Sequence, residues 1–122
     1  MIRLDSNYIL RYLVNDDKDM ANIAQEIIEN KNIYIANEVL AEVVYVLNGV
    51  YKASKEKIFL DLSELISFEN IYASNKAIVQ KALELYKDKN LDFVDCLLCA
   101  YSKIDEILTF DKKLNKCIEV KE

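Results

Sequence analysis

Two aspartates lie far apart in the sequence, and each ends a short apolar run. Asp5 closes the run that begins at Ile2, and Asp111 closes the run from Ile107 to Phe110. Residues that begin helices or form turns follow both aspartates. In an open parallel sheet, ligands collect outside the carboxyl ends of the strands. Two carboxylates at such positions indicate a shared site that holds a cation.

Three further acids extend this set, and each also has a purely structural interpretation. Asp92 opens an apolar segment, and Asp95 follows it one helical turn later. The pair can be an N-cap and the acid of a capping box, just as Asp5 can cap a helix and Asp111 can end in a turn. Glu42 lies at the predicted edge of an apolar helical face, where a charge needs a partner.

Carboxylates that converge need a cation for physical reasons. Two unpaired carboxylates 4 Å apart repel by about 4 kcal/mol at an effective dielectric constant near 20. Carboxylate oxygens are the natural ligands of Mg²⁺, and divalent ions activate water and neutralise the leaving oxygen in phosphodiester hydrolysis. The acids alone therefore favour a small metal-dependent nuclease, although 21 acids in 122 residues make chance placement easy.

Short apolar runs alternate with segments of helical periodicity along the chain. This alternation predicts an α/β fold with a parallel sheet, in a single domain over residues 1–122. The expected strands are 2–5, 33–35, 70–73, 107–110 and, less regularly, 118–120. The expected helices begin at Ser6, Asp17, Asn37, Ser54, Ser74 and Asp92.

Composition narrows the function classes. The formal net charge of −5 argues against broad electrostatic capture of nucleic acid. The chain has no histidine and one glycine, which excludes serine–histidine or cysteine–histidine hydrolysis and glycine-rich phosphate loops. The three cysteines are expected to be reduced thiols, with Cys96 and Cys99 serving as packing residues. No leader pattern or membrane-spanning run is recognised, so a cytoplasmic protein is expected.

Four segments resemble the motifs of the PIN-domain family, and in particular its VapC-type toxin ribonucleases. The first is similar to the family's opening Asp-Thr/Ser-Asn, the second and third carry its internal acids, and the fourth carries its last aspartate. In family order they are Asp5-Ser6-Asn7, Ala41-Glu42-Val43-Val44, Leu91-Asp92-Phe93-Val94-Asp95 and Leu108-Thr109-Phe110-Asp111. The motifs span the whole chain.

The resemblance implies a three-layer α/β/α sandwich with a short-stranded, mainly parallel central sheet. It implies an endoribonuclease that depends on Mg²⁺ or Mn²⁺, with Asp5 and Asp95 as the most direct metal ligands and Glu42 and Asp111 completing the cluster. Asn7, Thr109 and Asp92 are implied as supporting groups, and whether Asp92 or Asp95 contacts the metal stays open. The expected partners are RNA, a cognate antitoxin and a second copy of the chain in a homodimer, with no membrane.

Other functions compete with this hypothesis. A haloacid-type phosphatase needs an aspartate where Asn7 stands, and a receiver domain needs an aspartate at the end of a middle strand, which neither 33–35 nor 71–72 has. Two alternatives remain: a non-catalytic PIN-like interaction module, and a PIN nuclease that processes RNA outside a toxin–antitoxin pair.

Overall fold

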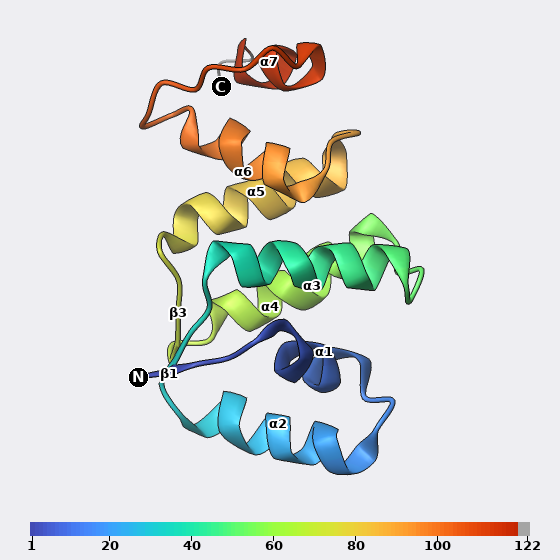
Figure 1. The fold of residues 1–122 in the computed structure, drawn as a ribbon. Helices are drawn as coiled ribbons and strands as arrows, with labels where there is room; N and C mark the ends of the chain where they lie inside the picture. Colours follow the sequence, from blue (N-terminus) through green and yellow to red (C-terminus); the bar gives the residue numbers. More distant parts are fainter. Residues whose placement is uncertain (120–122) are drawn as a thin grey trace.

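The computed structural model describes residues 1–119, which form seven α-helices and three short β-strands. The elements, in chain order, are β1 (Ile2–Arg3), α1 (Ser6–Val14), α2 (Lys18–Asn30), β2 (Ile33–Tyr34), α3 (Asn37–Gly49), α4 (Lys55–Ser67), β3 (Ile71–Tyr72), α5 (Lys76–Asp88), α6 (Phe93–Tyr101) and α7 (Lys112–Glu119). The strands lie along one side of a stack of helices that runs from α2 to α7 (Figure 1).

The sheet is parallel and follows the order β1-β2-β3. Ile2 pairs with Ile33, which in turn pairs with Ile71, so a single register runs across the three strands. The side chain of Asn70 donates to the carbonyl oxygens of Ile28 at 2.6 Å and Lys31 at 2.7 Å, which ties the end of α2 to the start of β3. The predicted α/β/α class with a short, parallel sheet is confirmed.

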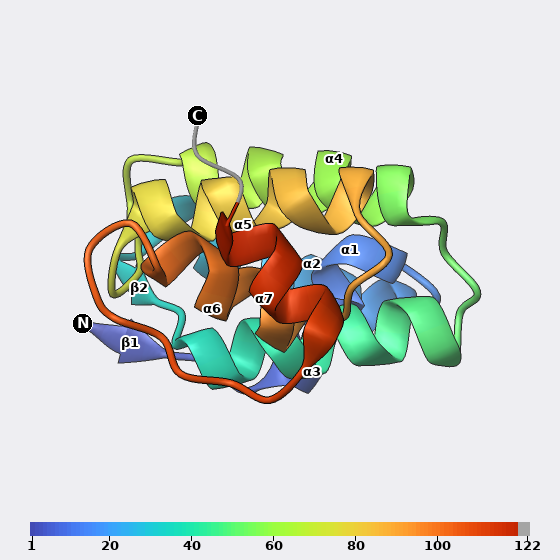
Figure 2. The same ribbon diagram turned by 90° about the horizontal axis from the view of Figure 1, so that it is seen from above.

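Apolar side chains from every helix form the core. The fully buried side chains of largest volume are Ile9, Ile28, Ile33, Ile35, Leu40, Ile58, Leu62, Leu65, Ile71, Leu83, Leu114 and Val43. Helix α5 packs against α4 and α6, while α3 contacts α1, α4 and α6. In the view from above, α7 lies across α6 (Figure 2). Helix α6 is therefore held between α3, α5 and α7.

The helix starts differ from the predictions by one residue in three places. Asp17, Ser54 and Asp92 cap their helices as predicted. Asp5, Ala36 and Asn75 occupy the cap positions predicted for Ser6, Asn37 and Ser74. An aspartate or asparagine one residue away supplies the cap in two of these cases, and at Ala36 no side chain caps the helix.

The predicted strand at 107–110 is wrong, because the segment has no regular secondary structure. Leu108 and Phe110 are almost fully exposed. The Thr109 hydroxyl accepts from the backbone N–H of Asp111 at 3.0 Å, and the Thr109 carbonyl accepts from the Asn115 side chain at 2.9 Å. These local bonds take the place of a strand ladder and lead directly into α7.

The strand proposed at 118–120 is also wrong as far as the structure describes it. Ile118 lies in α7, and Val120 is outside the described residues. The expectation of three reduced thiols is overturned as well, because Cys99 and Cys117 form a disulfide that joins α6 to α7. Cys96 is a free, buried thiol and packs in the core as expected.

None of the helices described over residues 1–119 is both long enough and apolar enough to cross a membrane.

Candidate active site

Three of the predicted site acids occupy helix N-termini. Asp5 follows β1 and accepts from the backbone N–H of Tyr8 at 3.0 Å, at the start of α1. Asp92 accepts from the N–H of Asp95 at 2.9 Å, and Asp111 accepts from the N–H of Leu114 at 2.8 Å. A carboxylate is stabilised there by the positive end of the helix dipole.

These caps leave part of each carboxylate free. Asp5, Asp92 and Asp111 each use Oδ1 for the cap, and Oδ2 makes no hydrogen bond within residues 1–119. The structural interpretation of these three acids as helix caps is therefore confirmed. One oxygen orients the side chain, and the other stays available to a ligand.

Asp95 is the acid whose surroundings favour a charge least. It lies half-buried on α6, one turn after Asp92, and its side chain forms no hydrogen bond in the described part of the chain. Burial raises the pKa of Asp95, and the negative charges of Asp92 and Asp111 raise it further. The charges of Asp92 and Asp111 thus act on Asp95, and no lysine or arginine within residues 1–119 forms an ion pair with these acids.

Asp111 is held by the polar residues around it. Thr109 accepts from its backbone, and Asn115 donates to the Thr109 carbonyl. The supporting role predicted for Thr109 is consistent with this geometry. Sequence reasoning missed Asn115, because the expected element after Asp111 was a turn; a helix capped by Asp111 would have placed Asn115 one turn inside it.

Asp5 and Glu42 are not among the charges that raise the pKa of Asp95. Asp5 and Asn7 are exposed at the start of α1, where Asp5 lines an open pocket with Arg3 and Tyr8.

The predicted position of Glu42 at the edge of the apolar face is wrong. Helix α3 buries Leu40, Val43, Val44 and Leu47, whereas Val39 and Val46 are only partly buried, so the centre of the buried face lies away from Glu42. Glu42 is consequently exposed to solvent. Its charge needs no partner from the protein there and is free to meet a ligand.

The donor chemistry of this region fits a hard divalent cation, since unpaired carboxylate oxygens repel one another until a cation neutralises them. The side chains do not converge on one point: no group of three His, Cys, Asp or Glu residues within 1–119 is arranged to hold a metal ion.

A family comparison decides the class of the protein. The model of the PIN domain matches residues 2–118, which is nearly the whole chain. The chain belongs to the PIN domain family. The matched range contains all seven predicted site residues.

One curated relative is similar over most of its length. It is the VapC ribonuclease of Aquifex aeolicus (strain VF5), 26% identical over 120 residues, which cover 93% of this chain and 89% of the relative. No solved structure matches the chain significantly.

Proposed function

We propose that this PIN-family chain is a metal-dependent endoribonuclease and the toxin of a toxin–antitoxin pair. The observation that carries the proposal is the group of Asp92, Asp95 and Asp111, which have no cationic partner within residues 1–119 and lie within the PIN match. Unpaired acids in one locality destabilise the fold, so a functional role explains their presence. The similarity to a protein named VapC ribonuclease supports RNA as the substrate.

The acids have distinct roles in this proposal. Asp95 and Asp5 supply the oxygens that bind Mg²⁺ or Mn²⁺ most directly, and Glu42 and Asp111 complete the site. A bound divalent ion neutralises the scissile phosphate and lowers the pKa of an attacking water. The caps at Asp5 and Asp111 fix one oxygen of each carboxylate, so that the free oxygen keeps a defined direction.

The remaining residues support this arrangement. Asp92 adds negative charge beside Asp95 and strengthens cation binding. Thr109 holds the backbone of Asp111 through a bond of 3.0 Å. Asn7, which is exposed in the first turn of α1, hydrogen-bonds a water or a phosphate oxygen in this proposal.

The proposed partners are RNA, a cognate antitoxin and a second copy of the chain in a homodimer. We place the single domain of residues 1–122 in the cytoplasm, where RNA substrates lie. The net charge of −5 suits a basic antitoxin segment. Sedimentation of the purified protein tests the dimer, and two copies per particle are expected.

Cleavage of pooled transfer and ribosomal RNA tests the enzyme. Wild type is expected to give discrete cleavage products with Mn²⁺ and no products with EDTA. Asp95→Asn is expected to give no products under either condition. Asp19→Asn, which removes an exposed charge from α2, is the matched control and should cleave like wild type. Intact RNA under every condition would favour the interaction module, which the non-convergent acid side chains also suit.

Induced expression in a bacterial host separates a toxin from an RNA-processing nuclease. The toxin is expected to arrest growth, and Asp95→Asn should leave growth unchanged at an equal protein level. Normal growth with a wild-type protein that is active in vitro would favour the processing enzyme.

A further inference from the structure

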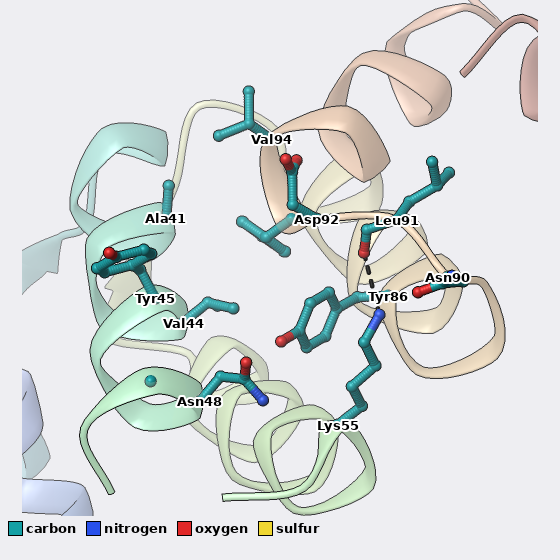
Figure 3. Close-up of a pocket in the computed structure, with 12 residues that line it drawn as sticks. Ala41, Val44, Tyr45, Asn48, Lys55, Tyr86, Asn90, Leu91, Asp92 and Val94 are labelled. Atoms are coloured by element: carbon teal, nitrogen blue, oxygen red, sulfur yellow. Dashed lines mark hydrogen bonds between the residues drawn. The ribbon is translucent and has the colours of Figure 1, made fainter. Parts of the chain in front are cut away.

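A pocket of about 440 Å³ opens between α3 on one side and α5 and α6 on the other (Figure 3). Tyr45 and Asn48 line it from α3, Tyr86 from α5, and Asp92 and Phe93 from the start of α6. The pocket is larger than a single nucleobase and open to solvent on one side.

This pocket adjoins the acidic group. Asp92 lines it and is also one of the two charges that raise the pKa of Asp95. On α3, Tyr45 lies three residues after Glu42, which places both on the same face of the helix. A polymer whose backbone reaches the acids can therefore place a neighbouring group in the pocket.

Tyr45 supplies an open aromatic wall. Its side chain is 78% exposed although it is a large aromatic residue. Val94, across the pocket on α6, is also exposed. An exposed tyrosine ring of this kind is a stacking platform for a flat, uncharged group.

Tyr86 supplies a polar group without a partner. The residue is only 4% exposed, and its hydroxyl points into the pocket toward Val44 and Asn48 (Figure 3). This hydroxyl forms no hydrogen bond to another group within residues 1–119, and it is not among the buried side-chain atoms that lack a partner, so water reaches it in the open pocket. A ligand that hydrogen-bonds the hydroxyl takes the place of that water.

The ring of Tyr86 is nevertheless held firmly. It packs edge-on against Phe93, with ring centroids 6.1 Å apart, and the Lys55 ammonium lies 4.4 Å from its centroid. Lys55 also donates to the carbonyl oxygens of Lys89 at 3.0 Å and Leu91 at 3.1 Å. These ring contacts fix the direction of the Tyr86 hydroxyl, and the Lys55 ammonium already donates two hydrogen bonds to backbone carbonyls.

We propose that this pocket binds one nucleobase of the RNA substrate next to the cleaved phosphodiester, with Tyr45 stacking on the base and the Tyr86 hydroxyl hydrogen-bonding its edge. The inference rests on the proposed ribonuclease function. A base fits better than a phosphate, because Asp92 lies at the rim and Lys55 is engaged by two carbonyls. Tyr86 then acts as a specificity-determining residue.

Fluorescence anisotropy with labelled hexamers of adenylate, cytidylate, guanylate and uridylate tests the stacking role, in EDTA to prevent cleavage. Tyr45→Ala is expected to weaken binding at least about fivefold, since stacking on an aromatic residue contributes this much per base. Tyr45→Phe should bind like wild type. Tyr72→Ala, which removes an exposed tyrosine from β3, is the matched control and should have no effect.

Tyr86→Phe tests the specificity role, because it removes one oxygen and keeps the packed ring. The affinities for the four hexamers are expected to become more similar to one another, while the melting temperature of the protein stays equal. If Tyr86→Phe bound the four hexamers with the same order and spread of affinities as wild type, Tyr86 would not be part of the base-binding subsite.

The failures of the two proposals can be told apart. Metal-dependent cleavage by wild type, with hexamer affinities equal for wild type and Tyr45→Ala, would overturn the base pocket alone. Hexamer binding that depends on Tyr45, with no cleavage in any metal, would keep the pocket and overturn the nuclease. A changed sedimentation coefficient of Tyr45→Ala with unchanged RNA affinity would assign Tyr45 to a protein contact and overturn the base pocket. The base pocket would also be overturned if the wild-type protein bound none of the hexamers.

Discussion

Two aspartates of this chain show how neighbouring groups determine whether an acid has a partner within the fold. Asp16 accepts from Arg11 at 2.7 Å, and this hydrogen bond lowers the pKa of Asp16. Asp95 has no such partner within residues 1–119; burial and two neighbouring carboxylates raise its pKa instead. The first charge is satisfied by the fold, whereas the second is left to solvent or to a bound group.

Replacing Asp95 by asparagine is expected to stabilise the metal-free protein and to abolish its activity. The substitution removes a half-buried charge that two other acids repel, so the melting temperature in EDTA should rise. Loss of a metal ligand should lower RNA cleavage at least about 100-fold. Calorimetric melting and cleavage rates check both parts, and a lower melting temperature in EDTA would show that Asp95 is not under repulsion.

The Cys96 thiol is expected to resist alkylation in the native protein. Its side chain is fully buried, and burial raises its pKa to about 12. The folded pKa lies above the ordinary value of 9.0, so burial of the thiol contributes its full stability below about pH 9 and loses it as the pH rises toward 12. Mass spectrometry after iodoacetamide treatment at pH 8 should find Cys96 unmodified until denaturant is added; rapid modification without denaturant would contradict its burial.

Sequence reasoning at the residue scale found the acids but not all of their surroundings. Asp92 and Asp95 could be predicted because acids opening an apolar helix are conspicuous. The exposure of Glu42 could not, because it depends on which side of α3 the neighbouring helices cover. Asn115 could not be found before α7 was known to begin after Asp111.

At the scale of the elements, the contact of α6 with α7 decides the geometry of the acidic group. Helix α6 carries Asp95, and the turn into α7 carries Asp111. The Cys99–Cys117 disulfide joins the same two helices. A change in this connection therefore acts on both stability and the spacing of the acids.

Reduction of the disulfide is expected to lower stability by about 3 kcal/mol, because a bridge across a sequence separation of 18 residues restricts the unfolded chain. The melting temperature should fall by about 10 °C when a phosphine reductant is added. Cys117→Ser should melt at the lower temperature with or without reductant. Three titratable thiols in the denatured, unreduced protein would show that no bridge forms.

The elements themselves were largely predictable, and the exceptions have physical causes. Alternating apolar patterns located the three strands and the first six helices. The run Ile107–Phe110 has the composition of a strand, but side-chain bonds of Thr109 and Asn115 to the backbone compete successfully with sheet pairing. The disulfide was missed because its cysteines are 18 residues apart and only the packing of α7 on α6 brings them together.

At the scale of the whole molecule, the fold gathers acids at an energetic cost that a cation can offset. The PIN match over residues 2–118 includes all of these acids. The four-acid metal set stays a prediction, since the described side chains do not form a closed cation site.

Divalent metal is therefore expected to raise the melting temperature. Binding at ten times the dissociation constant stabilises the native state by about 1.4 kcal/mol, or about 5 °C for a chain of this size. Scanning calorimetry with millimolar Mn²⁺ or Mg²⁺ measures the shift, which should shrink in Asp95→Asn and persist in Asp19→Asn. Equal melting temperatures with metal and with EDTA would count against cation binding by the acids.

Cleavage of a covalently closed circular RNA tests the central claim most directly, because only an endonuclease can open a circle. Wild type with Mn²⁺ is expected to convert circles to linear molecules, while wild type with EDTA and Asp95→Asn with Mn²⁺ leave them closed. Circles that stay closed with wild type and Mn²⁺, or that open equally with Asp95→Asn, would contradict an endoribonuclease site built on these acids.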